Sequence, residues 1–186
     1  VWADFIEDKS RVLFDDALRS THPIWTPVQT PEEAIEMFDS ITYQKGCAVM
    51  RQLENFLGEA PFRDGLRAYM KQFAYSNALG ADLWRALEVS SGQPVSTLMH
   101  SWVAQAGYPV VDLTLGESQD GATPLQLAQQ RFYSEPGVPR SDQLWCIPLV
   151  VRYEDDSGVR THRFICQSQS HTELLPSQGQ VRWCYA

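Results

Sequence analysis

Histidine is scarce in this sequence, and no motif arranges what there is into a metal site. The 186 residues contain four histidines, His22, His100, His162 and His171. There is no HExxH pattern and no helical pair of histidines four residues apart, which are common zinc-binding signatures. Ordinary surface or half-buried positions are expected for the last three. The chain by itself is therefore predicted to bind no metal ion and no other cofactor.

Cysteine pairs are also lacking. Cys47, Cys146, Cys166 and Cys184 show no CxxC spacing, and none lies near a histidine at a zinc-ligand distance in sequence. We interpret them as buried free thiols of a protein in a reducing, cytoplasmic compartment. A disulfide among the last three remains an alternative at this stage.

Several other functional classes lack their signatures. The net charge is −8, without a basic stripe, which argues against nucleic acid as a partner. No GxSxG or phosphate-binding loop occurs, and no apolar run is long enough to predict a membrane span. Nothing at the start resembles a signal peptide. The chain begins at Val1 within a helical pattern, so we expect it to be an excised piece of a longer protein; processing is the alternative explanation.

What the sequence does contain is a change of hydrophobic period near residue 108. Residues 1–107 show successive helical stripes, with a helix from Gly46 to a stop at Gly58, a helix from Pro61, and two more before Gly107. On the helix from Pro61, Met70 is expected to face inward. Short polar connections predict a compact array of helices.

The second half is predicted to be an antiparallel β-sandwich. Residues 108–186 contain five short segments rich in β-branched and aromatic residues, separated by clusters of Gly, Pro, Asp and Ser. The segment "EDDSGV" has the composition of a hairpin turn. Pro148 predicts an edge position or a bulge. The fold class is therefore α+β, a helical segment followed by a sandwich.

One short segment, "FDSITYQKG" at residues 38–46, places Tyr43 at the start of an amphipathic helix. A packed aromatic side chain is one interpretation. The other is a catalytic phenol, because phenols carry their proton at neutral pH and can donate it to a developing oxyanion. Spacing alone does not separate the two. The acidic stretch "PEEAIEMFD" before it is interpreted as the first turns of a helix, where carboxylates favour the helix dipole.

Three segments together resemble the M1 family of zinc aminopeptidases (gluzincins). They are "LRSTHPI", then "FDSITYQKGCAVMRQLENFLGEAPFRDGLRAYM", then "DLWRALEVSSGQPVSTLMHSWVAQAGYPVV", and they cover residues 18–111. "LWCIPLVVRY" is similar to the sandwich domain of that family. The resemblance implies that residues 1–107 are the distal, helical part of a thermolysin-like catalytic domain. It also implies that residues 108–186 are the sandwich domain, shortened at its end.

By this resemblance Tyr43 matches the tyrosine of the family's Tyr-x-Lys-Gly pattern. It would donate a hydrogen bond to the oxyanion of the tetrahedral intermediate. Lys45 and Gly46 complete the pattern, Lys45 as a surface or structural charge and Gly46 to permit close helix packing. His22 is assigned no role beyond the fold. The family's zinc ligands lie upstream of the portion present, so the parent is expected to bind zinc and this chain to be inactive.

The resemblance implies a parent protein that removes N-terminal residues from peptides, with a peptide substrate as its partner. A second hypothesis is an aminopeptidase-like scaffold or peptide-binding module without catalysis, which could bind partners by strand addition to an open sheet edge. Retention of Tyr43 in its pattern favours the enzyme. Weak self-association of the chain through exposed apolar surface is also expected.

Overall fold

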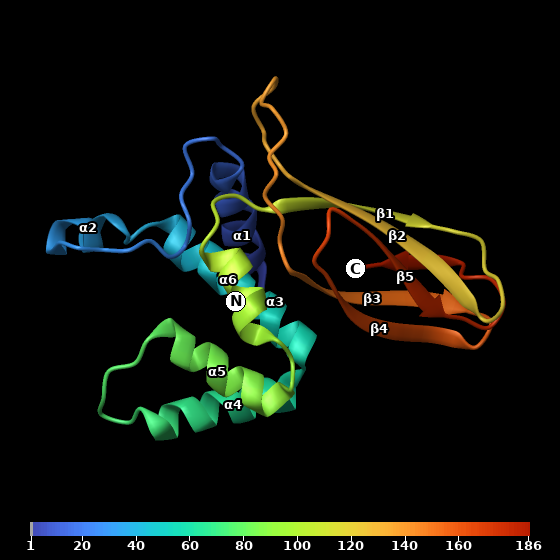
Figure 1. The fold of residues 1–186 in the computed structure, drawn as a ribbon, viewed down its shortest axis with the longest axis horizontal. Helices are drawn as coiled ribbons and strands as arrows, with labels where there is room; N and C mark the ends of the chain where they lie inside the picture. Colours follow the sequence, from blue (N-terminus) through green and yellow to red (C-terminus); the bar gives the residue numbers. More distant parts are fainter. Residues whose placement is uncertain (1) are drawn as a thin grey trace. The chain divides into compact units, whose positions relative to one another are not determined.

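The computed structural model describes residues 2–186, and the chain divides into two compact units, Val1–Gly107 and Tyr108–Ala186. Helices form the first unit and antiparallel strands form the second, as Figure 1 shows. The predicted α+β fold class is thereby confirmed. Within the described residues, no helix has both the length and the apolar character needed to cross a lipid bilayer.

The helical unit follows the order that the hydrophobic stripes predict, with one addition. A single π-helical turn, η1, immediately precedes the helix that begins at Gly46. The elements are α1 (Trp2–Asp16), α2 (Pro31–Glu36), η1 (Ile41–Lys45), α3 (Gly46–Leu57), α4 (Glu59–Gln72), α5 (Gly80–Ser91) and α6 (Val95–Val103).

Local sequence explains where several helices start and stop. Thr30 caps α2, since its side chain accepts a hydrogen bond from the Glu33 N–H while the Glu33 carboxylate accepts one from the Thr30 N–H. Gly58, at φ 87°, ends α3, and Gly92, at φ 67°, ends α5. Both glycines adopt backbone angles that side chains with a Cβ atom disfavour. The predicted stop at Gly58 is therefore confirmed.

The core of the helical unit differs from the prediction at two positions on α3 and α4. Met70 is 67% exposed, so it does not belong to the inward face of α4. The glycine that permits close packing is Gly65, where an added Cβ atom would lie 2.8 Å from Leu87 of α5. At Gly46 the nearest atom to an added Cβ would be 4.0 Å away, on Ile24, which is ordinary contact. The packing role assigned to Gly46 is wrong.

The second unit consists of two three-stranded antiparallel sheets. In one, β2 lies between β1 and β5; in the other, β3 lies between β4 and β6. The strands are β1 (Pro109–Leu115), β2 (Ala122–Arg131), β3 (Ile147–Asp155), β4 (Gly158–Cys166), β5 (Ser170–Pro176) and β6 (Trp183–Tyr185). The prediction of five strands omitted β5, whose alternation is weak because Leu174 is exposed and polar residues fill its first half.

The two sheets form the layers of a sandwich (Figure 1). Alternate side chains of the central strands β2 and β3 are buried between them, among them Leu125, Leu127, Val151 and Tyr153. The hairpin predicted at "EDDSGV" joins β3 to β4. Pro148 lies on the middle strand of its sheet, but β6 pairs with β3 only from Arg152 to Glu154. Within the described strands, Pro148 therefore has a neighbour on one side only, which suits a residue without an N–H.

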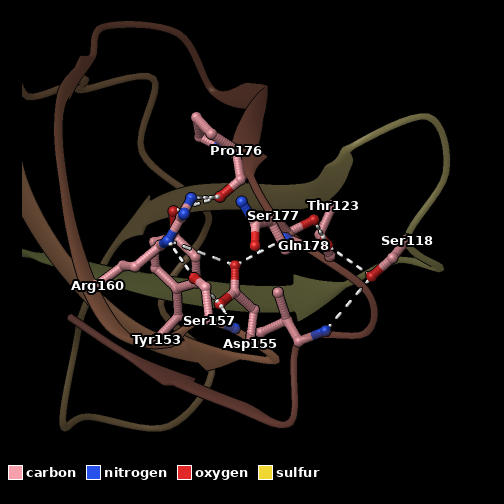
Figure 2. A network of polar contacts seen from close by, with 10 residues as sticks. Ser118, Thr123, Tyr153, Asp155, Ser157, Arg160, Pro176, Ser177 and Gln178 are labelled. Atoms are coloured by element: carbon pink, nitrogen blue, oxygen red, sulfur yellow. Dashed lines mark hydrogen bonds and ion pairs between the residues drawn. The ribbon is translucent and has the colours of Figure 1, made fainter.

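At one end of the sandwich, a buried carboxylate ties the β3–β4 turn to the segment after β5 (Figure 2). The Asp155 side chain is fully buried; one oxygen accepts hydrogen bonds from the N–H and hydroxyl of Ser157, and the other accepts one from the Gln178 N–H at 2.8 Å. The Arg160 Nε lies 3.5 Å from it. The Ser157 hydroxyl and the Gln178 N–H lower the pKa of Asp155 to about 2, in spite of its burial.

All four cysteines are free thiols. Cys146 and Cys166 are buried, as the interpretation predicted, whereas Cys47 is exposed. Burial raises the pKa of the Cys146, Cys166 and Cys184 thiols, which keeps them protonated and unreactive. The alternative of a disulfide among these three is not found in the structure.

Candidate functional site

Tyr43 lies at the centre of the π-turn η1, directly before α3. Its backbone N–H donates to the Asp39 carbonyl at 3.1 Å, and its own carbonyl accepts from the Gly46 N–H. The side chain is 56% exposed, and its ring contacts that of Phe38 at 6.0 Å between centroids. Isolated π-turns are rare in proteins, and those that exist are often found at functional sites. The fold therefore presents the phenol on the surface of the unit and does not pack it into the core.

The N-terminal end of the π-turn is held by Asp39. One carboxylate oxygen accepts a hydrogen bond from the Thr42 N–H at 2.9 Å, the geometry of a helix N-cap. The other lies 2.5 Å from Nε2 of His22. The second ring nitrogen of His22, Nδ1, lies 2.8 Å from the carbonyl oxygen of Pro23. Both ring nitrogens thus face acceptors, an arrangement that suits the imidazolium form.

The charges of this pair reinforce each other. Partial burial opposes ionisation of His22, but the Pro23 carbonyl and the Asp39 carboxylate outweigh it, and the pKa of His22 is raised. Burial likewise opposes ionisation of Asp39, but the Thr42 N–H and His22 outweigh it, and the pKa of Asp39 is lowered. An ion pair at this end of η1 is the consequence.

The C-terminal end of the π-turn is held by a buried ion pair. The Lys45 side chain is 2% exposed, and its Nζ lies 2.8 Å from Oδ2 of Asp16, which is fully buried. Nζ also donates to the Gly107 carbonyl at 2.9 Å. The other oxygen of Asp16 accepts from the Gly107 N–H at 3.0 Å and from the Thr21 hydroxyl at 2.7 Å. Of the two roles expected for Lys45, the structural charge is the correct one.

A small hollow of about 130 Å³ lies beside Tyr43, between α1 and the start of α3. Gln44 contributes a side-chain oxygen that is shielded from solvent and accepts no hydrogen bond from residues 2–186. The hollow is lined by Phe5, Asp8, Lys9, Tyr43, Gln44 and Cys47.

Tyr43, the predicted site residue, lies in the same turn as Lys45. The Tyr43 side chain is exposed, whereas the Lys45 side chain is buried. Sequence reasoning did not foresee the ion pairs of His22 with Asp39 and of Asp16 with Lys45. Asp39 carried a usable signal, because an aspartate three residues before a backbone N–H at a helix start is a typical N-cap. Asp16 carried none, since its partner Lys45 lies 29 positions further along the chain.

The remaining histidines belong to other elements, α6, β4 and β5. His100 is exposed on α6, as predicted. His162 of β4 and His171 of β5 both contact the carboxylate of Glu173, at 2.8 and 3.0 Å. Among the residues that the structure describes, there is no group of three or more His, Cys, Asp or Glu side chains arranged to hold a metal ion.

The family model of the peptidase family M1 domain matches residues 1–102, more than half of the sequence and the whole of the π-turn with its two ion pairs. The chain belongs to peptidase family M1. The resemblance carried by "FDSITYQKG" and the segments around it is thereby confirmed. Members of this M1 family are zinc metallopeptidases.

Individual M1 relatives extend the match into the sandwich. Aminopeptidase M1-A of Oryza sativa subsp. japonica is 45% identical over 151 residues, which is 81% of this chain and 16% of that protein. The puromycin-sensitive aminopeptidase of Caenorhabditis elegans is 36% identical over 185 residues, 98% of this chain and 19% of that protein. Tricorn protease-interacting factor F2 of Thermoplasma volcanium is 39% identical over 152 residues, which is 81% of this chain and 18% of that protein. The chain thus spans less than a fifth of the length of these relatives.

The described residues offer no set of ligands for a metal ion, and the sequence has no HExxH motif. The phenol of Tyr43 is exposed on a turn that is bounded by two ion pairs.

Proposed function

We propose that this chain is part of an M1 aminopeptidase that hydrolyses N-terminal residues from peptides, and that Tyr43 stabilises the oxyanion of the reaction. The observation that carries the proposal is the position of the phenol. Tyr43 is exposed at the centre of a π-turn within the region matched to the M1 domain. A tyrosine needed only for packing would gain most by being buried.

The chemical role follows from charge development. Attack on the scissile carbonyl converts its oxygen into an oxyanion, and a fixed hydrogen-bond donor stabilises that charge more in the transition state than in the bound substrate. The phenol of Tyr43 is such a donor. The nucleophile and the metal ligands have to come from outside this chain, so the chain alone is proposed to be inactive. Its residues 1–107 are assigned to the catalytic domain and 108–186 to the sandwich domain.

The experiment is Tyr43→Phe in the full-length parent enzyme. Loss of one oxyanion donor typically lowers kcat by roughly 10²–10³-fold. We expect a fall of that order with KM nearly unchanged, because the bond forms mainly in the transition state. Phe38→Leu, which alters the neighbouring ring without removing a donor, is the comparison variant. Turnover of Tyr43→Phe close to wild type would return Tyr43 to a packing role and favour the scaffold hypothesis.

A further inference from the structure

One short segment of chain, residues 16–23, forms ion pairs at both ends of the π-turn that carries Tyr43. Asp16, at the end of α1, binds Lys45 at the C-terminal end of the turn. His22, six residues later, binds Asp39 at the N-terminal end. Thr21 adds a hydrogen bond to Asp16. Two ion pairs from the same segment thus enclose the five residues Ile41–Lys45.

The phenol lies at a largely open position, beside the hollow lined by Phe5, Asp8 and Lys9. Its side chain is more than half exposed, and the ring contact that the structure records is with Phe38, itself 70% exposed. The orientation of Tyr43 therefore depends on the backbone of η1. That backbone is an uncommon conformation, since π-helices are rare even as single turns. A turn of this kind needs support from its surroundings, and the two ion pairs provide it at the two points where it joins the chain.

The two ion pairs differ in how deeply they are buried. Lys45 and Asp16 are almost completely buried, at 2% and 0% side-chain exposure. Removing either leaves a buried charge without its partner, which destabilises the whole fold. His22 and Asp39 are about one third exposed, at 37% and 33%. Replacement of His22 is therefore tolerable for folding, and His22 can be tested for an effect on Tyr43 itself.

We propose that His22 is a positioning residue for Tyr43: by binding Asp39 it fixes the start of the π-turn and so holds the phenol in the single orientation that meets the substrate oxyanion. This rests on the proposed role of Tyr43. His22 itself touches neither substrate nor the reacting atoms. Its hydrogen bond to Asp39 acts through the Asp39 carboxylate, the Thr42 N–H and the Tyr43 backbone.

The test is a double-mutant cycle in the full-length parent enzyme, with His22→Leu and Tyr43→Phe as the two changes. Misplacement of a reacting group by about 1 Å can cost roughly 10²-fold in rate. We expect His22→Leu to lower kcat by roughly 10- to 10²-fold without raising KM. In the Tyr43→Phe background the same change should alter kcat by less than about twofold, because no donor remains to be positioned.

Two further variants separate positioning from folding. His22→Gln keeps a nitrogen that can donate to Asp39 and should recover most of the lost kcat. His100→Gln, at an exposed position on α6, is the matched control and should leave kcat unchanged. A fluorotyrosine placed at position 43 alone gives a second readout. Its fluorine resonance should be single in the wild type and should broaden or split with His22→Leu.

The outcomes distinguish this inference from the function on which it rests. If Tyr43→Phe alone keeps wild-type turnover, the proposed function fails and the positioning role fails with it. If Tyr43→Phe is slow but His22→Leu lowers kcat by the same factor in both backgrounds, His22 serves the fold only. No effect of His22→Leu on kcat in the wild-type background would also overturn the proposal.

Discussion

The helical unit and the sandwich both bury polar groups, but they satisfy them in different ways. In the helical unit the most buried polar contact joins two full charges, Lys45 and Asp16. In the sandwich, neutral partners dominate, since the side-chain amide of Gln129 binds both the N–H and the carbonyl of Trp145, at 2.9 and 3.0 Å. Even Asp155 is satisfied chiefly by a hydroxyl and by backbone N–H groups.

The difference also extends to the surface. Most of the large hydrophobic side chains that the structure exposes belong to the helical unit, including Trp2, Phe38 and Tyr43. The helical unit thus combines a buried ion pair with exposed aromatic side chains. In the sandwich, the buried polar groups, including the Asp155 carboxylate, are bound mainly by neutral hydrogen-bond partners. The two units therefore differ both in how they bind their buried polar groups and in how much large hydrophobic surface they expose.

The largest expected effect tests this contrast at the buried ion pair. Lys45→Met leaves the Asp16 carboxylate buried without its cation, which costs roughly 3–5 kcal/mol in the free energy of unfolding. Peptide-resolved hydrogen exchange should show the loss in η1 and α3. Lys71→Met, at an exposed position on α4, is the control. Equal stability of Lys45→Met and Lys71→Met would show that the pair contributes nothing.

A smaller effect is expected at the corresponding place in the sandwich. Gln129→Leu removes the amide hydrogen bonds to Trp145 and the one to the Ser168 carbonyl at 3.0 Å. We expect this substitution to cost roughly 1–3 kcal/mol in the free energy of unfolding, because the hydrogen bonds that are lost join uncharged partners. Hydrogen exchange should accelerate in β2 and in the segment before β3. Gln126→Leu, at an exposed position of the same strand, should be neutral; a loss as large as that of Gln129→Leu would contradict the comparison.

The smallest expected effect is a pH dependence that separates the two units. The raised pKa of His22 means that its stabilisation is complete below 6.5 and lost as the pH rises through the folded-state pKa. The lowered pKa of Asp39 means that its stabilisation is complete above 3.8 and lost as the pH falls through the folded-state pKa. The difference in unfolding free energy between wild type and Asp39→Asn should therefore be largest between pH 3.8 and 6.5.

The stability difference between wild type and Asp39→Asn should be about 1 kcal/mol or less, because the side chains of His22 and Asp39 are partly exposed and screened by solvent. Asp155 in the sandwich behaves differently, with stabilisation that is complete above 3.8, persists at alkaline pH and is lost as the pH falls towards 2. Urea unfolding of wild type, Asp39→Asn and Asp155→Asn at a series of pH values measures the contributions of Asp39 and Asp155 to the free energy of unfolding. A difference for Asp39→Asn that stays constant to pH 9 would contradict the ion pair with His22.

Local sequence signals predicted much of the fold. Gly58 and Gly92 end their helices because only glycine readily takes their backbone angles, and those positions could be read directly. Strand β5 could not be predicted in this way, because most of its residues are polar and apolar residues do not alternate with polar ones along it. The close approach of α4 to α5 at Gly65 depends on which helices pair, and that information lies outside any single helix.

The candidate site divides in the same way. Tyr43 was predicted from the Tyr-x-Lys-Gly pattern, and its role stays a prediction. The π-turn was not foreseen, since its residues Ile41–Lys45 have no composition that separates them from an ordinary first helical turn. The His22–Asp39 pair joins residues 17 positions apart, and the Asp16–Lys45 pair joins residues 29 positions apart. Such pairs are settled by the tertiary fold, so neither Asp39 nor Asp16 could be matched to its partner in advance.

The π-turn has one consequence for the phase of the helix that it begins. A π-turn holds about one residue more than an α-helical turn, and one residue corresponds to about 100° of rotation around a helix axis. Deleting a single residue within Ile41–Lys45 would leave α3 and its buried stripe intact. The turn could then close as an ordinary α-helical turn, and a different side chain would face the place where Tyr43 now stands.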